Sequence, residues 1–212
     1  MLVRHTRRMA LIGGAATLTA IVFGLAATWR PRWYRPPVSD PDQARADKAA
    51  IVRLQDQISA ALNAGRPIRV RLAVDQVNRW LAMPDALWSG TRLLPPAWQH
   101  PCLRIDGSVL TLGITARAGD WGVVLSLTCA LSVTPDWLVI RTTCANVGAI
   151  PVPISWLSLP AELRARVERS GGTWEAGTIR LPSEWVWPNG KRRFRVGECY
   201  LVADSLEVLL EP

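Results

Sequence analysis

The stretch LRIDGSVLTLGITARAGDWGVVLSLTCALSVTPDWLVIRTTCANV, residues 103–147, decides the fold of this chain. It contains apolar residues that alternate with polar or small ones, and a period of two is typical of half-buried β-strands. Turn signals separate the runs at Gly107-Ser108, Gly119-Asp120 and Pro135-Asp136. The stretch therefore predicts an antiparallel meander of four strands.

A sheet with one apolar face must bury that face against a second layer, and helices on either side of the meander can supply it. A long amphipathic helix is predicted from Pro41, with Asp40 as its N-cap, to a stop at residues 65–67. Its apolar face carries Ile51, Leu54, Ile58, Ala61 and Leu62.

The remaining segments complete an α+β pattern. Short elements are predicted as a strand over 68–72, a helix over 74–83, a helix over 160–169 and a final hairpin that turns near Ala203-Asp204. Prolines and glycine within 87–101 predict a long irregular loop. The expected fold is α+β, with a curved, mainly antiparallel sheet packed on helices.

The chain begins with a predicted membrane anchor. Residues 9–29, MALIGGAATLTAIVFGLAATW, carry no charge, and about 20 apolar residues suffice to span a bilayer as a helix. We therefore predict a cytoplasmic tail over 1–8, a transmembrane anchor over 9–29, a Pro/Arg-rich linker over 30–39 and one extracytoplasmic domain over 40–212. Cleavage near Gly24–Ala27, or twin-arginine export signalled by Thr6–Leu11, are the alternatives.

Charge does not decide the orientation of this anchor, because three arginines precede the span and three follow it. The short tail cannot hold a domain, and all four cysteines follow the span, as an oxidising compartment permits. We expect a single-pass protein of the inner membrane with its domain in the periplasm or at the cell exterior.

The composition favours a membrane partner over a nucleic acid. The formal net charge is +8, but basic residues beyond the anchor are scattered among acidic ones. Eleven tryptophans stand against two phenylalanines and two tyrosines. Trp29 and Trp33 flank the span and fit the interfacial belt of a bilayer.

No catalytic constellation, metal site or cofactor motif is visible. His100 is the only histidine after the tail, and no G-x-S-x-G sequence accompanies it. The cysteines lie too far apart for close C-x-x-C zinc spacing. No cofactor and no enzymatic activity are expected.

The four cysteines allow a pair of disulfides. If the hairpin turns at residues 135–136, Cys129 lies opposite Thr142, which would put Cys144 on the same face as a diagonal neighbour. A Cys129–Cys144 disulfide is then feasible, and Cys102 would join Cys199. Buried free thiols are the alternative.

Aromatic and basic residues supply the candidate ligand site. Tryptophans in the loop and before a basic turn could line a cleft, and arginines after that turn could hold a phosphate headgroup. The candidate ligand-binding residues are Trp88, Trp98, Trp185, Trp187, Arg192 and Arg193.

The order of these features resembles small membrane-anchored bacterial envelope proteins of the YpmS-like and LmeA-like kind. The resemblance rests on the N-terminal span, the Val74–Leu81 segment VDQVNRWL, the meander, Ile150–Pro153, and the Trp187–Gly190 segment WPNG before a terminal hairpin. It implies an elongated sheet wrapped around a helix, with an apolar groove suited to lipid. The cysteines and the many tryptophans depart from that pattern.

Two functions are therefore expected. The first is a membrane-anchored module that binds a lipid or another apolar ligand between sheet and helices. The alternative is an envelope assembly or scaffold protein, without catalysis, that docks a partner protein through a free helix face or a sheet edge. Ile51, Leu54 and Ile58 are its candidate contacts.

Overall fold

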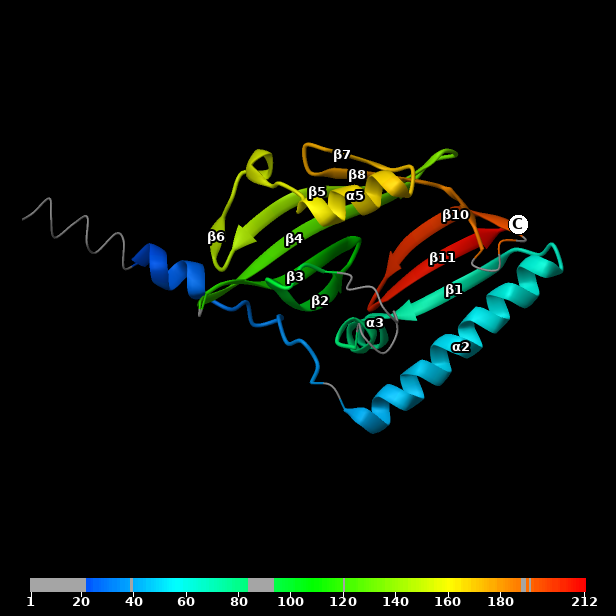
Figure 1. The fold of residues 1–212 in the computed structure, drawn as a ribbon, viewed down its shortest axis with the longest axis horizontal. Helices are drawn as coiled ribbons and strands as arrows, with labels where there is room; N and C mark the ends of the chain where they lie inside the picture. Colours follow the sequence, from blue (N-terminus) through cyan, green and yellow to red (C-terminus); the bar gives the residue numbers. More distant parts are fainter. Residues whose placement is uncertain (1–21, 39, 84–93, 120, 188–189, 191) are drawn as a thin grey trace, which may run out of the picture.

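The computed structural model describes residues 22–38, 40–83, 94–119, 121–187, 190 and 192–212 (Figure 1). Residues 22–28 are helical. The other elements are α2 (Pro41–Asn63), β1 (Ile68–Ala73), α3 (Val74–Leu81), β2 (Trp98–Asp106), β3 (Val109–Ala118), β4 (Trp121–Val133), β5 (Trp137–Val147), β6 (Ile150–Pro151), the 3-10 helix η1 (Ile154–Trp156), α5 (Ala161–Arg169), β7 (Thr173–Glu175), β8 (Thr178–Pro182), β9 (Glu184–Val186), β10 (Arg193–Val202) and β11 (Ser205–Glu211).

Two antiparallel sheets form the framework. The larger has seven strands in the order β2-β3-β4-β5-β8-β7, with β6 paired to β5, and the smaller has the order β1-β11-β10-β9. The predicted meander is confirmed as β2 to β5, and the final hairpin as β10 and β11. The α+β class and the mainly antiparallel sheet are also confirmed, whereas sequence reasoning missed β7, β8 and β9.

The chain passes from one sheet to the other at Ser183, between β8 and β9. The Ser183 amide donates to the Asp136 carbonyl at 2.9 Å, and the Ser183 carbonyl accepts from the Val196 amide at 2.8 Å. Its hydroxyl donates to the Pro135 carbonyl at 2.6 Å, and the residue is 2% exposed. All polar groups of this buried corner are therefore paired, as burial requires.

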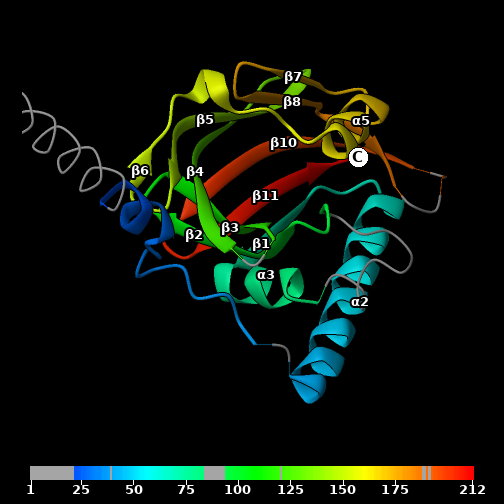
Figure 2. The ribbon, with the colours of Figure 1, turned by 60° about the vertical axis from the view of Figure 1, so that its left-hand side comes forward.

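Helix α3 joins the opposite edges of the two sheets, since it contacts both β1 and β2. The side chain of Asn78 replaces a neighbouring strand: its Nδ2 donates to the Leu103 carbonyl at 2.9 Å, and its Oδ1 accepts from the Leu103 amide at 2.6 Å. Figure 2 shows the strands curved, with α3 beneath β1 and β2 and with α2 beside them.

Helix α2 packs on one face of the smaller sheet. Asp40 caps it, because its Oδ1 accepts from the Asp42 amide at 3.0 Å, and Pro41 occupies the first turn, as predicted. The helix buries its apolar face against the sheet. This cluster comprises Ile58, Leu62, Val70, Val196 and Leu210, and Leu54, Trp185, Trp187, Phe194 and Val133 pack around it.

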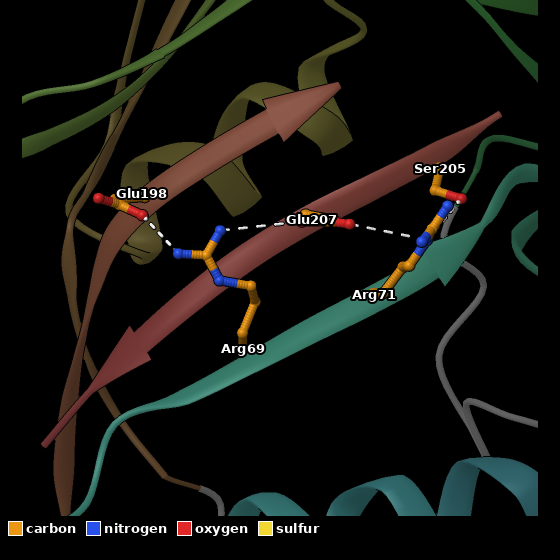
Figure 3. Close-up of polar contacts among 5 residues, drawn as sticks. All are labelled: Arg69, Arg71, Glu198, Ser205 and Glu207. Atoms are coloured by element: carbon orange, nitrogen blue, oxygen red, sulfur yellow. Dashed lines mark hydrogen bonds and ion pairs between the residues drawn. The ribbon is translucent and has the colours of Figure 1, made fainter. Parts of the chain in front are cut away.

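The other face of the smaller sheet is charged (Figure 3). The Arg69 guanidinium lies 3.1 Å from a Glu198 carboxylate oxygen and 3.8 Å from one of Glu207. Arg71 lies 3.7 Å from Glu207 and donates from Nε to the Ser205 hydroxyl at 3.2 Å. The two arginines and the two glutamates of this face are therefore paired with one another across the strands.

Residues 30–38, within the predicted Pro/Arg-rich linker, pack on the larger sheet, and we call them the strap. Tyr34 is 7% exposed and lies in a cluster with Cys102 and Val124, with Trp33 packed beside it. The Tyr34 hydroxyl donates to the His100 carbonyl at 2.6 Å and lies 2.7 Å from the Thr115 hydroxyl. Trp33 is thus half-buried, with part of its ring packed on this cluster.

The helical residues 22–28 end against the larger sheet. The Ala149 amide donates to the Ala26 carbonyl at 2.9 Å, and the backbone of Gly148 approaches Ala26 and Ala27 closely. Among the described residues, no helix has both the length and the apolar character needed to span a bilayer. The predicted tail and residues 9–21 of the predicted anchor lie outside the described residues.

Candidate apolar binding surface

The central strand β4 separates apolar from small or polar side chains. Every odd-numbered residue from Val123 to Val133 is apolar, whereas the even-numbered positions include Ser126, Thr128 and Ser132. Residues that pair across antiparallel strands share a face, so the neighbouring strands extend the pattern. We call this surface the aliphatic face. Its large side chains that stay partly exposed include Leu103, Leu110, Leu112, Leu125, Leu127, Leu131, Ile140 and Leu181.

The aliphatic face is only half-buried. All eight of these large side chains are of intermediate exposure, although most lie on inner strands of the sheet. On the opposite face of β4, Val124 and Ser126 are 2% and 5% exposed, Val124 within the Tyr34 cluster. Buried residues therefore occur on both faces, because Ile105, Ile114, Cys129 and Ala145 on the aliphatic face are 7%, 2%, 7% and 1% exposed.

Helix α5 covers the part of the aliphatic face nearest β7 and β8. A Cβ placed on Gly172 would lie 3.0 Å from both Leu181 Cδ2 and Val167 Cγ1. The helix therefore approaches the sheet closely at the Leu181 end, while Leu125 and Leu127 stay half-buried on β4.

The other end of the aliphatic face is aromatic. Trp98 pairs with Ala116, and Trp121 pairs with Ala118, so both positions belong to the same face as Leu112 and Leu125. Trp98 is half-buried, whereas Trp121 is 73% exposed. Of the predicted ligand residues, Trp98 is the one that the structure places on this surface.

The other predicted ligand residues are not gathered around a common cleft. Trp185 and Trp187 pack against the α2 cluster, and Trp187 donates from Nε1 to the Ser59 hydroxyl at 2.9 Å and makes an edge-on contact with Phe194. Their predicted role as an amphipathic rim is therefore not supported by where they lie. Trp88 lies outside the described residues.

The two predicted arginines also differ in their surroundings. Arg193 pairs with Glu184 at 2.9 Å, so its charge is already compensated at the surface. Arg192 is exposed, and its carbonyl accepts from the Trp187 amide at 2.8 Å, which closes the hairpin.

One cavity among the described residues is polar. It has a volume of about 260 Å³, lies at the bulge of β10 around Gly197, and includes Arg195, Glu198 and Glu211 in its lining. Arg195 and Glu211 pair at 2.6 Å. This hollow is smaller than typical ligand pockets, and its lining also includes Val133, at one end of the aliphatic face.

The four cysteines are free thiols in this structure. Cys129 pairs with Thr142, as predicted, but a register shift after Thr128 makes Cys144 the partner of Thr128. Because Thr128 and Cys129 point to opposite faces, Cys129 is buried and Cys144 is exposed on the other side. The expected diagonal pairing of Cys129 with Cys144 is therefore wrong.

Cys102 and Cys199, the other expected disulfide pair, lie in different sheets. Cys102 belongs to the Tyr34 cluster on the larger sheet, whereas Cys199 lies in the smaller sheet opposite Val208. His100 is exposed at the irregular register of β2 and has a φ of 53°, and its carbonyl serves the Tyr34 hydroxyl. The described residues contain no group of three side chains suited to a metal ion.

Comparison of the chain with protein-family models, with curated proteins and with solved structures finds no match. Sequence alternation along residues 121–133 was the signal for the aliphatic face. What it could not signal is that the strap packs on the opposite face, against Gly113 and Cys102.

Proposed function

We propose that this chain is a membrane-anchored extracytoplasmic protein that binds the acyl chain of a lipid, or a ligand of similar apolar shape, on the aliphatic face. The observation that carries the proposal is the row of half-buried leucines on inner strands of the larger sheet. Covering such side chains with hydrocarbon is favourable by roughly 0.8 kcal/mol for each methylene group removed from water.

The N-terminal segment supports the membrane part of the proposal. The helical residues 22–28 are part of the uncharged run of residues 9–29, and their side chains include Phe23 at 59% exposure and Leu25 at 67%. Exposed apolar residues on a helix within an uncharged run suit a lipid environment.

The alternative is docking of a partner protein, and the apolar face of α2 supports it less than expected. Ile58 is 8% exposed in the α2 cluster, and Leu54 packs against that cluster. Ile51 is half-buried as well. The residues expected to meet a partner are therefore used to hold α2 on the smaller sheet.

The test compares two aspartate variants of the full chain on the same strand. Leu127 lies on the aliphatic face, and Ala130 is exposed on the opposite face of β4. We expect the wild type and Ala130→Asp to take up a fluorescent phospholipid and to carry a discrete lipid mass in native mass spectrometry. Leu127→Asp should lose both signals, because its carboxylate would have to give up its hydration to contact an acyl chain.

Circular dichroism checks that the variants are folded. If Leu127→Asp is unfolded, Leu127→Trp replaces it, because the larger ring fills space over the face without adding charge. A wild-type chain that neither carries nor takes up lipid would refute the proposal, as would equal uptake by the Leu127 and Ala130 variants.

A further inference from the structure

The end of the larger sheet that carries Trp121 lies beside the N-terminal segment. The Gly148 amide donates to the Val124 carbonyl at 2.7 Å, and the next residue, Ala149, donates to Ala26. Trp121 is three residues before Val124 on β4, which is roughly 10 Å along a strand. The β3–β4 hairpin and residues 22–28 therefore occupy the same end of the molecule, as Figure 1 also shows for β6 and this helix.

Exposed tryptophan and arginine gather at this end. Trp29 is 58% exposed and Trp121 is 73% exposed, and the side chains of Arg30 and Arg117 are exposed next to them in sequence or register. Within the part of the chain that the structure describes, neither arginine forms an ion pair. Indole rings with basic side chains are the groups that favour the headgroup layer of an anionic bilayer.

The strap leaves the aliphatic face open at this end. Tyr34 and Trp33 lie against Gly113 and Cys102, on the opposite face of the sheet from Trp121 and Leu125. The strap thus contacts the face of the larger sheet that lies opposite the aliphatic face. The tryptophan end of the aliphatic face is left beside the anchor without a covering strap.

We infer that this end of the larger sheet rests on the bilayer surface, with Trp121 at headgroup depth, so that the aliphatic face receives its ligand directly from the membrane in which the chain is anchored. The inference rests on the proposed function, since it names the bilayer lipid as the source of the apolar ligand. A vacant aliphatic face would open toward the bilayer rather than toward bulk water.

Photocrosslinking of the full chain in nanodiscs of phosphatidylethanolamine and phosphatidylglycerol tests the inference. A p-benzoylphenylalanine replaces Trp121 in one variant and Trp156 in a matched control, since Trp156 is 76% exposed. Trp156 lies in η1, and η1 packs near Gly177, whose carbonyl accepts from the Thr142 amide. Thr142 is five residues before Val147 on β5, which is roughly 16 Å along the strand. The η1 segment that carries Trp156 is therefore anchored away from the end of β5 that lies beside residues 22–28.

We expect a phospholipid adduct, detected by mass spectrometry, from position 121 and at least tenfold less from position 156. Absence of an adduct at 121, or equal yields at the two positions, would overturn the inference. Because Trp121 is exposed, its replacement leaves the packing of the sheet intact.

Two further probe positions separate the possible failures. A probe at Leu127 reports on lipid held by the aliphatic face, and a probe at Phe23 reports on the anchor. Adducts at 121 without any at 127 would refute the proposed function and leave the bilayer contact standing, whereas the reverse would refute the bilayer contact alone. A silent probe at Phe23 would overturn both, because the chain would then lie outside the membrane.

Discussion

Gly113 shows how a single side chain position controls the packing of the strap. A Cβ at Gly113 would lie 2.6 Å from Tyr34 Cδ2 and 2.7 Å from Trp33 Cη2, which is closer than real Cβ atoms approach carbon. The absence of a side chain therefore lets two aromatic rings lie directly on β3. The same contact holds Tyr34 where its hydroxyl reaches His100 and Thr115.

Gly113→Ala should consequently destabilise the protein by about 1 to 3 kcal/mol, since overpacking forces the rings away from their positions. Thermal unfolding of the full chain in detergent micelles measures the effect. Gly122→Ala is the matched control, because its Cβ would meet the Thr115 methyl group at 3.3 Å and Arg117 Cγ at 3.9 Å, with no aromatic ring in the way. Equal melting temperatures for the two variants would show that the strap does not depend on Gly113.

Helices α2 and α3 are joined by a buried charge pair, which is the clearest interaction at the scale of elements. Asp47 is 3% exposed, and its Oδ2 lies 3.0 Å from Arg79 Nε, while the Arg79 side chain is 37% exposed. An uncompensated carboxylate at this depth would cost more than the pair itself contributes. The pair therefore fixes how the first half of α2 meets α3.

Arg79→Gln should lower the free energy of unfolding by about 2 to 3 kcal/mol, which is below the value for a fully buried pair because Arg79 is partly solvated. Chemical denaturation of the full chain measures this loss. The double variant Asp47→Asn with Arg79→Gln should recover most of it. Arg45→Gln is the control, since its pair with Asp42 at 3.0 Å is 81% and 86% exposed and should change stability by less than about 0.5 kcal/mol. Equal losses in the two single variants would contradict the argument.

Elements with local causes were predictable from the sequence. The Asp40-Pro41 start of α2 and the turns of the meander depend on residues within a few positions, and the structure has them where they were expected. The strap was not predictable in this way. Tyr34 is held by partners 66 and 81 residues away, and a proline-rich sequence gives no sign of them.

The candidate site was predictable only in part for the same reason. Alternation along β4 indicated an apolar face, but not which layer covers it. From the sequence, Trp187 is equally consistent with a residue that lines a cleft and with a core residue. In the structure it is held in the core by its hydrogen bond to the Ser59 hydroxyl, 128 residues away. One inserted residue on β5, also invisible in the sequence pattern, moved Cys144 to the opposite face from Cys129.

At the scale of the whole molecule, buried thiols and one buried phenol make the free energy of unfolding depend on pH in the alkaline range. Burial raises the pKa of the thiols of Cys102, Cys129 and Cys199, and it also raises the pKa of the Tyr34 phenol. In each case the folded state keeps a proton that the unfolded chain releases. Only two residues of the chain are lysine, so few other groups titrate in this range.

The sign of the effect follows from proton binding. Above roughly pH 8.5, where an unfolded thiol ionises, the unfolded state binds fewer protons than the folded state, and the free energy of unfolding falls as the pH rises. The stability is fully present below that pH and is lost as the pH rises through the raised folded values. Each thiol can contribute a slope of at most about 1.4 kcal/mol per pH unit.

We therefore expect the melting temperature of the full chain, measured with a reductant present, to be constant from pH 7 to pH 8 and to fall steeply toward about pH 10. Cys129→Ala should make the fall shallower, because the variant lacks one buried thiol that must ionise on unfolding. Cys144→Ala removes an exposed thiol and should leave the slope at its wild-type value. A slope that is the same in all three proteins would mean that the buried thiols do not govern alkaline unfolding, and that the interior around Cys129 is more open to water than its 7% exposure indicates.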